Sequence, residues 1–517
     1  MDEFRARRRK DYKRLTIGSI SVATVAFVIY ALAHGRLFYA VAASLIPLMI
    51  LILVESFARK QFAFLMLFIV NYFIAVIPHY LYNFPSGMLM DIMILFDILV
   101  ICSNALVRNV SAKKVNWGVL AVLGVWLLFC FLEVFNPRML DLKAWMSGMR
   151  SLALYFFMVY LIVQLTTENL KDIKDIILVL SFLVIIATIK VLYQRYVGFT
   201  SGDKYFLNVL DGRRTHIIYY GIRYFSIFSD AANFGGSMGL CFVLYAIVGL
   251  HTKKISLKIY WWFIAMLALY GTFISGTRSA LVIPVAGVMV YLLLVRDFKK
   301  MVPVGIALGV VIYFLACTSI GNSSSTIRRA RTVFHRKEDA SYLIRLDNRA
   351  KLRTILADMP FGNSLGMSGG RGRKYGDKSE ASEIPTDSWY VQVWVETGIV
   401  GASIYFAIMA FLFIYGGYLV MFKIKNEELK GYTAGMLSGV IGLFAMSSNN
   451  EVFSQFPNGI IVYTFIALIF MSPKIDRTLQ IEKTDDRPQT PDFADNGGLQ
   501  RAGTDLRPAG IPETERS

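Results

Sequence analysis

The chain has 517 residues, 56% of them hydrophobic, and a mean hydropathy of +0.52. An ordinary soluble protein of this length would be less apolar and more highly charged, so these values exclude that class. The net charge of +18 arises from 54 Lys and Arg against 36 Asp and Glu. The four cysteines lie in or beside apolar runs without metal-binding spacing, so they predict neither a metal site nor a disulfide framework.

Apolar runs with few charges recur along the chain, and about 20 such residues cross the roughly 30 Å hydrocarbon core as a helix. Fourteen runs are predicted to span, at residues 15–33, 37–54, 61–80, 88–107, 117–135, 151–165, 175–193, 231–250, 259–275, 279–295, 301–320, 398–422, 431–447 and 458–472. Spanning strands would be half as long and alternating. The fold class is therefore all-α, a polytopic membrane helix bundle with a large extracytoplasmic loop region.

Lys and Arg in the short loops predict the orientation, because cytoplasmic loops are enriched in them. The N-terminal segment 1–14 has seven between Arg5 and Arg14, and every second loop after it is also basic. The alternate loops 81–87 and 448–457 have none. Residues 15–472 therefore form one membrane domain with both termini cytoplasmic. The polar, Pro-containing segment 473–517 is predicted to be a disordered cytoplasmic tail.

Two long outer loops depart from this charge pattern. The loop 194–230 carries Arg213, Arg214 and Arg223, and the loop 321–386 holds thirteen Lys and Arg against seven Asp and Glu. Guanidinium groups bind phosphate bidentately, so these loops suit a polyanion. The alternative is a solvated surface that is basic without binding anything.

Charged and titratable residues in or near the spans are the next candidates. Arg278 lies between two spans with almost no room for a loop, and such an arginine usually faces a cavity, although it can also snorkel. Asp91 and Asp97 share one apolar run, where a structural ion pair and a catalytic role are both open. His216 and His335 lie in the outer loops; each is either a general base or a structural residue.

Several short motifs follow one another in the second half of the chain. They are Arg-Tyr-Phe-Ser-Ile-Phe-Ser-Asp-Ala-Ala-Asn-Phe-Gly at 223–235, Gly-Thr-Arg-Ser-Ala-Leu at 276–281, Arg-Leu-Asp-Asn-Arg at 345–349, Met-Pro-Phe-Gly at 359–362, Thr-Asp-Ser-Trp-Tyr at 386–390 and Glu-Thr-Gly-Ile-Val-Gly at 396–401. Their order, together with the long outer loop 321–386, resembles the O-antigen ligase and polymerase superfamily of bacterial membrane glycosyltransferases. The resemblance covers about residues 220–420.

The resemblance implies an enzyme of the bacterial inner membrane that needs no metal or other cofactor. In that family a glycan on an undecaprenyl diphosphate carrier moves to an acceptor hydroxyl outside the membrane. The expected partners are that lipid-linked glycan, a glycan or lipid acceptor and the surrounding lipids, without nucleic acid. Arg223 and Arg278 would stabilise the leaving diphosphate, and Asp387 would deprotonate the acceptor. Expected substrate-binding residues are Arg345, Arg349, Arg213, Arg214 and Asn233.

The sequence departs from the family at one position. The family usually has a His-Asn pair before the span that opens with Glu-Thr-Gly, and this chain has Asp387-Ser388. Asp387 then acts either as the base or as an N-cap, since Thr386, Asp387 and Ser388 all suit that position. Ligase and polymerase both remain open, as does a transporter or flippase for lipid-linked glycans, although no internal symmetry of a transporter is visible.

Overall fold

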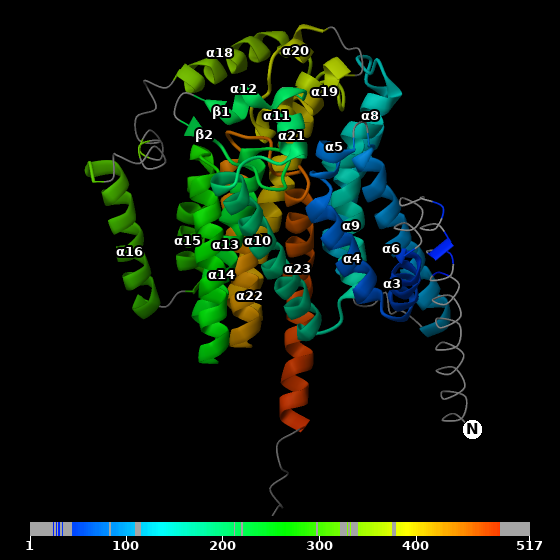
Figure 1. Ribbon diagram of the computed structural model, residues 1–517, viewed down its shortest axis with the longest axis vertical. Helices are drawn as coiled ribbons and strands as arrows, with labels where there is room; N and C mark the ends of the chain where they lie inside the picture. The colour runs from blue at the N-terminus through cyan, green and yellow to red at the C-terminus, as the bar shows by residue number, and fades with distance from the viewer. Residues whose placement is uncertain are drawn as a thin grey trace, which may run out of the picture.

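The computed structural model describes residues 44–81, 84–108, 115–210, 212–218, 221–295, 298–320, 340–374 and 379–485, with a few isolated positions besides. The fold is an all-α membrane bundle, as the sequence predicts (Figure 1). Within the described residues, ten helices are long and apolar enough to span a membrane. They are α6 (Ser86–Arg108), α7 with η2 (Trp117–Leu132, Glu133–Phe135), α8 with η3 and α9 (Leu142–Met149, Arg150–Leu154, Tyr155–Thr166), α10 (Leu170–Tyr196), α13 (Ala231–His251), α14 (Ile255–Ile274), η4 with α15 (Arg278–Leu281, Val282–Val295), α21 with η7 (Trp389–Tyr418, Leu419–Lys423), α22 (Glu427–Met446) and α23 (Asn458–Asp485).

The predicted count of fourteen stays a prediction. The predicted span 15–33 lies almost wholly outside the described residues. The spans predicted at 37–54, 61–80 and 301–320 coincide with helices that are not among the ten. These helices are α3 (Ile46–Ala58), α4 (Lys60–Phe73), α5 (Ile77–Tyr80) and α16 (Phe298–Cys317).

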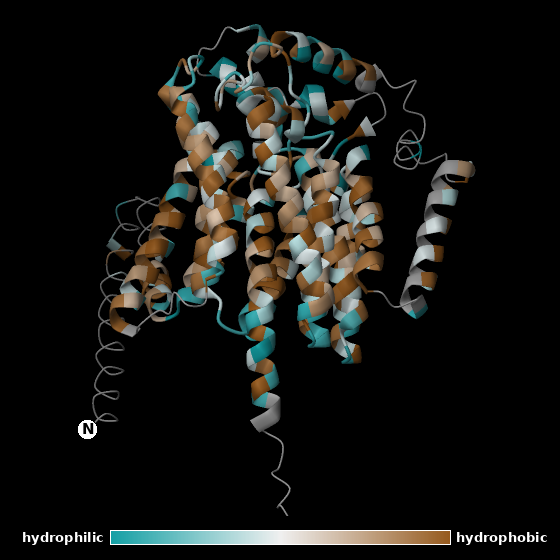
Figure 2. Ribbon diagram, turned by 180° about the vertical axis from the view of Figure 1, so that it is seen from behind, coloured by the Kyte–Doolittle hydropathy of each residue, from teal (hydrophilic) through white to brown (hydrophobic). Residues whose placement is uncertain are grey.

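A cap of short elements covers one end of the bundle (Figure 1). It contains α11 (Ser201–Asn208), α12 (Arg213–His216), α18 (Ala340–Ile355), α19 (Gly369–Lys374), α20 (Glu380–Glu383) and the antiparallel pair β1 (Ile217–Ile218) and β2 (Gly221–Ile222). In Figure 2 the middle of the bundle is mostly hydrophobic, whereas hydrophilic residues gather in the cap and at the far helix ends. The two long loops that break the charge pattern therefore meet at the same end.

The centre of the bundle is a close contact between α13 and α22. Glycines recur every fourth residue on α22, at Gly431, Gly435 and Gly439. A Cβ at Gly435 would lie 3.0 Å from the Leu244 carbonyl oxygen, and one at Gly439 would lie 3.1 Å from that of Leu240. Small residues at this spacing let two helix backbones approach within a membrane, where packing replaces the hydrophobic effect.

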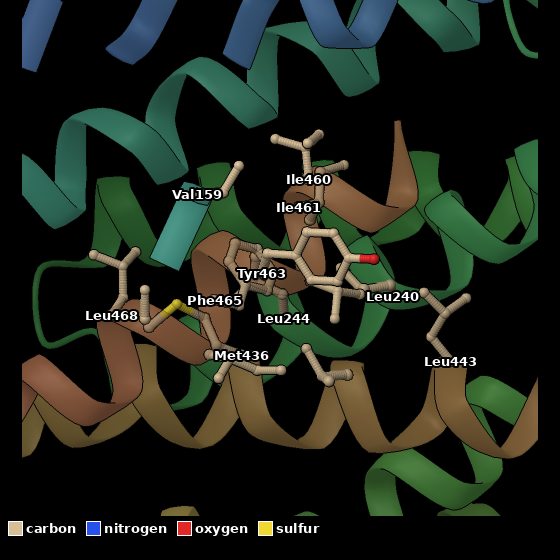
Figure 3. Packing of buried hydrophobic residues seen from close by; sticks show 14 of the residues in the cluster. Val159, Leu240, Leu244, Met436, Leu443, Ile460, Ile461, Tyr463, Phe465 and Leu468 are labelled. Atoms are coloured by element: carbon tan, nitrogen blue, oxygen red, sulfur yellow. The ribbon is translucent and has the colours of Figure 1, made fainter. Parts of the chain in front are cut away.

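Apolar side chains of four helices complete this centre (Figure 3). Leu240 and Leu244 of α13 lie beside Met436 and Leu443 of α22, and α23 covers them with buried side chains that include Tyr463. The ring of Tyr463 stacks on Phe156 of α9 with centroids 4.5 Å apart. The loops that precede α13 and follow α22 are thereby held together at the capped end.

Several helices extend beyond their predicted bounds, and two of them show the cause. The span predicted to begin at 151 begins at Leu142, because Asp141 caps α8 by accepting a hydrogen bond from the Lys143 backbone N–H at 2.6 Å. The predicted tail 473–517 begins as helix, since α23 continues to Asp485. Asp476 holds that extension by accepting from the backbone N–H groups of Lys425 and Asn426. Residues 486–517 lie outside the described residues.

The Met-Pro-Phe-Gly and Glu-Thr-Gly motifs pack backbone against backbone. Gly398, inside α21, has φ +65° and kinks the helix, and Gly362 has φ +75°. A Cβ on Gly398 would lie 2.1 Å from the Pro360 carbonyl oxygen, and one on Gly362 would lie 2.4 Å from the Gly398 nitrogen. Only glycine fits these positions, because both the conformation and the space exclude a side chain.

Replacing Gly398 by alanine is therefore expected to destabilise the cap and the kink of α21. The left-handed conformation alone costs about 1–2 kcal/mol for an L-residue, and the clash with Pro360 adds to it. We expect a lower thermal midpoint and less monodisperse protein in detergent than for the wild type. Gly118→Ala is the matched control, because its Cβ would meet only the Asn116 side chain at 3.6 Å. Equal stability of the two variants would contradict this assignment.

Candidate functional site

The first wall of the site is the segment before α13. The short β1–β2 pairing and the bond from the Arg223 N–H to the His216 carbonyl, at 2.8 Å, hold Arg223 at the end of a hairpin. Asp230 then caps α13 by accepting from the N–H groups of Ala232 and Asn233, at 2.8 and 3.0 Å. The motif at 223–235 thus holds the Arg223 guanidinium and the Asp230 carboxylate in fixed positions before α13.

The Gly-Thr-Arg-Ser motif forms the second wall. Gly276, with φ +60°, makes the tight turn between α14 and η4. Thr277 Oγ1 accepts a hydrogen bond from Arg223 Nη2 at 2.8 Å, and Ser279 Oγ accepts one from the Asn450 side chain. The motif therefore ties Arg278 to Arg223 on one side and to the 447–457 loop on the other.

Three guanidinium groups gather where these walls meet. Burial lowers the pKa of Arg223 from its ordinary value, the Asp230 carboxylate opposes this, and the positive charges of Arg278 and Arg345 lower it further. Arg223 Nε is buried without a hydrogen-bond partner among the described residues. Like charges repel more strongly in a poorly solvated site, so this arrangement favours an anion as its missing partner.

Helix α18 supplies one face of the site. Arg345, Asn348 and Arg349 stand at i, i+3 and i+4, which places them on one side of the helix. Asn348 Nδ2 donates to Asp387 Oδ2 at 3.2 Å, and Arg349 Nη2 donates to the Ser448 carbonyl at 2.8 Å. The Arg-Leu-Asp-Asn-Arg motif thus supplies one arginine to the site, orients the Asp387 carboxylate and anchors the cap.

A cavity of about 580 Å³ opens between these walls. Polar and charged residues dominate its lining: Thr215, Asp230, Ala232, Arg345, Ser368, Gly369, Gly370, Arg371, Arg373, Pro385, Thr386, Asp387, Gln392, Asn450, Glu451, Val452 and Gln455. All of them come from the capped end of the bundle. The lining therefore combines arginines with carboxylates, and of the three clustered arginines Arg345 belongs to it whereas Arg223 and Arg278 do not.

Asp387 is held in an uncommon conformation at the entrance to α21. Its φ is +53°, a left-handed value that costs a non-glycine residue roughly 1–2 kcal/mol. Ser388 occupies the N-cap position, and among the described residues no side chain caps this helix. Instead the Trp389 N–H donates to the carbonyls of Ser447 and Asn450, both at 3.1 Å. Strain of this kind clusters at functional sites, and the geometry gives Asp387 no capping role.

Glu451 is a second carboxylate in the cavity wall. Burial raises its pKa from the ordinary value, whereas the hydrogen bond from Thr386 Oγ1 and the charge of Arg371 lower it. The negative charges of Glu396 and Asp387 raise it again. A carboxyl group whose proton is held more tightly than usual suits acid–base work near neutral pH.

Three predicted binding residues lie elsewhere. Arg213 and Arg214 are exposed on α12 and do not line the cavity. Asn233 is fully buried, where its Nδ2 donates to Ser229 Oγ and to the Phe456 carbonyl at 2.8 and 2.6 Å, and its Oδ1 accepts from Asn458. These bonds hold the start of α13 against α23. A binding role for these three residues stays a prediction.

The histidines contribute structure or lie outside the described residues. His216 Nε2 accepts from the Ala231 N–H at 3.1 Å, and Nδ1 contacts the Gly212 carbonyl at 2.8 Å. Burial lowers the pKa of His216, which matches a neutral ring with both nitrogens engaged. His335 lies outside the described residues. His216 is therefore a structural residue that supports the hairpin rather than a proton acceptor.

Glu451, Arg371 and Asn348 are site residues that the sequence analysis does not single out. Arg371 belongs to a basic loop and Asn348 to a recognised motif, so each carries a weak signal. Glu451 lies within the cation-free loop 448–457 after α22, without a motif of its own. Within the described residues no three potential metal ligands lie together, and the expectation that no metal is needed stays a prediction.

Comparison with known families gives one match. The sequence model of the family described as O-antigen ligase matches residues 263–406. No curated protein matches the chain. The matched range includes Arg278, Arg345 and Asp387, and excludes Arg223 and Glu451.

The fold and the match together define a multi-pass membrane protein with a glycosyltransferase-like domain. The match at residues 263–406 supports the O-antigen ligase and polymerase superfamily that the motifs resemble.

The orientation of the capped end is open to a direct test. In a chain whose four native cysteines are replaced, Arg373→Cys would place a thiol in the cavity lining. We expect a membrane-impermeant maleimide to label it from the outer face of intact inner membranes. Lys425→Cys, in the loop at the opposite end, is the control and should react only after lysis. The reverse pattern would show that the capped end is cytoplasmic.

Proposed function

We propose that the protein is an O-antigen ligase-like membrane glycosyltransferase. It moves a glycan from a lipid diphosphate carrier, of the undecaprenyl type, to an acceptor hydroxyl on the periplasmic face. The observation that carries the proposal is the cluster of Arg223, Arg278 and Arg345, because Arg345 also lines a cavity that contains Asp387 and Glu451. A diphosphate leaving group needs cationic groups that stabilise its negative charge. A hydroxyl nucleophile needs a carboxylate that takes its proton.

The reaction is a single inverting displacement at the anomeric carbon. The acceptor hydroxyl gives its proton to a carboxylate, and its oxygen forms a bond to that carbon. The bond from the same carbon to the diphosphate oxygen breaks, and its electron pair leaves with the diphosphate. No oxidant or further reactant is needed, because the diphosphate ester is already activated.

The arginines stabilise the leaving group. As the glycosidic bond breaks, negative charge grows on the diphosphate oxygen, and preorganised guanidinium donors bind it more strongly than they bind the ground state. Arg223 is oriented by Thr277, and its positive charge adds to those of Arg278 and Arg345 at this place. Arginine suits the role better than lysine, since its planar donors match phosphate bidentately.

The carboxylates receive the proton. Asp387 stands at the position where the family usually has a His-Asn pair, and Asn348 orients its carboxylate. Glu451 lies beside it in the same wall, with a raised pKa. We assign the base role to Asp387, with Glu451 as the group that shares or relays the proton.

A repeat-unit polymerase of the same superfamily uses the same chemistry on a different acceptor. A gel profile of surface glycans from a deletion strain separates the two. Accumulation of lipid-linked polymer together with loss of all anchored polymer indicates a ligase, and collapse of the ladder to one repeat unit indicates a polymerase. Unchanged glycans, or repeat units trapped on the inner face, would contradict both and favour a transporter or flippase.

Arg278→Ala is expected to abolish transfer in the complemented deletion strain. Loss of one preorganised donor for a developing negative charge typically costs about 10²–10³-fold in rate. The measurement is the surface-glycan gel, with protein level followed by immunoblot. Arg353→Ala is the control, because Arg353 is an exposed arginine of α18 that does not line the cavity. Full glycan product with Arg278→Ala would contradict the proposal.

The pH profile tests the carboxylates. An ionised base acts only above its pKa, so transfer should fall as the pH is lowered through the raised pKa of Glu451. Thr386→Val removes a hydrogen bond that lowers this pKa, so the acid limb should move to higher pH. Thr354→Val on the exposed face of α18 is the control. An Asp387→Asn variant with normal activity would remove the base role from Asp387.

A further inference from the structure

A second cavity of about 510 Å³ adjoins the first. The two share Asp230, Arg371 and Gln455 in their linings. The second cavity is bounded by the capped ends of α6, α8 and α9, by α5 and α11, and by the loop before α23. Nothing in the mechanism above uses it, although it lies directly beside the carboxylates.

The wall of this second cavity alternates polar and apolar groups. Ser147, Arg150 and Ser151 stand near the rings of Tyr155 and Phe206. A sugar offers hydroxyl groups at its edges and C–H groups on its faces, so it can meet both kinds of surface. Pockets for small ligands commonly combine a largely apolar wall with a few converging polar groups.

The polar side of this wall is rigid. Arg150 Nη1 donates to Asp91 Oδ2 at 2.5 Å, and Tyr155 Oη donates to Asp91 Oδ1 at 2.7 Å. Asp91, one of two acidic residues in an apolar run, therefore orients the wall as a structural ion-pair partner. Arg150 and Ser151 belong to the π-helical turn η3, and such turns within α-helices occur frequently at functional sites.

Arg371 connects the two cavities. Its Nη1 donates to Ser151 Oγ at 2.9 Å, and its charge acts on the Glu451 carboxyl in the first cavity. A hydroxyl group that enters from the second cavity therefore reaches the shared boundary beside the carboxylates. Arg345 of the arginine cluster lines the first cavity and not the second, so the leaving diphosphate is expected in the first.

We propose that the second cavity, bounded by Gly87, Ser147, Arg150, Ser151, Tyr155 and Phe206, binds the carbohydrate part of the acceptor. This inference rests on the proposed transferase function, in which donor and acceptor must approach the anomeric carbon from opposite sides. The donor diphosphate occupies the arginine side of the first cavity. The acceptor hydroxyl crosses the Arg371 boundary and gives its proton to the carboxylates there.

Gly87 offers a way to block only this cavity. It lines the second cavity but not the first, and a Cβ added there would meet no atom within 4 Å. Gly87→Leu therefore extends into open space without displacing fixed atoms. Filling a ligand pocket in this way should lower transfer by at least about tenfold, since the acceptor is excluded. Gly87→Ala, which adds one methyl group, should keep most of the activity.

Two measurements separate acceptor binding from donor binding. Transfer is measured as surface glycan in the complemented deletion strain, and carrier binding as retention of undecaprenyl diphosphate by the purified full-length protein. We expect Gly87→Leu to lose transfer while it keeps carrier binding within about twofold of the wild type. Gly118→Leu, at an exposed position at the start of α7, is the control and should leave both unchanged.

Two results would overturn the inference. Normal transfer by Gly87→Leu would show that the acceptor does not use this cavity. Loss of carrier binding in parallel with transfer would assign the cavity to the donor lipid or its glycan. Failure of the proposed function itself has a different signature, because Arg278→Ala would then leave both transfer and carrier binding intact.

Discussion

The close packing of α13 on α22 is the constraint on which the site depends. Glycines at every fourth position of α22 allow the two backbones to approach, and buried leucines of α13 with side chains of α9 and α23 fill the space around them. Within a membrane such contacts supply the association energy that burial from water supplies in soluble proteins. The segment that ends at Asp230 and the loop that begins at Ser447 are held together as a result.

A buried hydrogen-bond network secures the same region. Asn458 donates to the carbonyl oxygen and the side-chain oxygen of Asn233, and Asn233 in turn donates to the Phe456 carbonyl. Unsatisfied polar groups are costly at membrane depth, so these amides align α13 and α23 with a fixed register. This explains how Asn233 can matter to the site without lining it.

The arginine cluster shows how the cap and the bundle combine. Arg223 comes from the hairpin, Arg278 from a turn between two spans and Arg345 from α18. Three like charges in a partly buried site are unfavourable without an anion, so the scaffold must oppose their repulsion. Thr277 on Arg223 and the carboxylate of Asp230 do part of this, and a bound diphosphate would do the rest.

Sequence patterns predicted the membrane helices and several candidate site residues, because these features depend on residues close together in the chain. Hydrophobic runs predicted the membrane helices. The observed helix bounds differ from the predicted ones where a polar residue outside the run caps or anchors the helix, as Asp141 does for α8 and Asp476 does for α23. Motif order led to the superfamily. Arg278 followed from its position at a membrane edge, where a charge is costly, and the other candidate arginines followed from the two basic loops and the motifs. For Asp91 the sequence left both a structural ion pair and a catalytic role open, and only the contact with Arg150 in the structure favours the ion pair.

The sequence by itself determined the all-α membrane class, the two long basic loops and the family motifs, because each depends on residues that are neighbours in the chain. The tertiary structure decided that Arg223, Arg278 and Arg345 meet, that Glu451 stands beside Asp387, and that two cavities share a boundary at Arg371. Those facts join segments separated by tens to hundreds of residues. These segments come together only through the packing of whole helices, which a local sequence pattern does not predict.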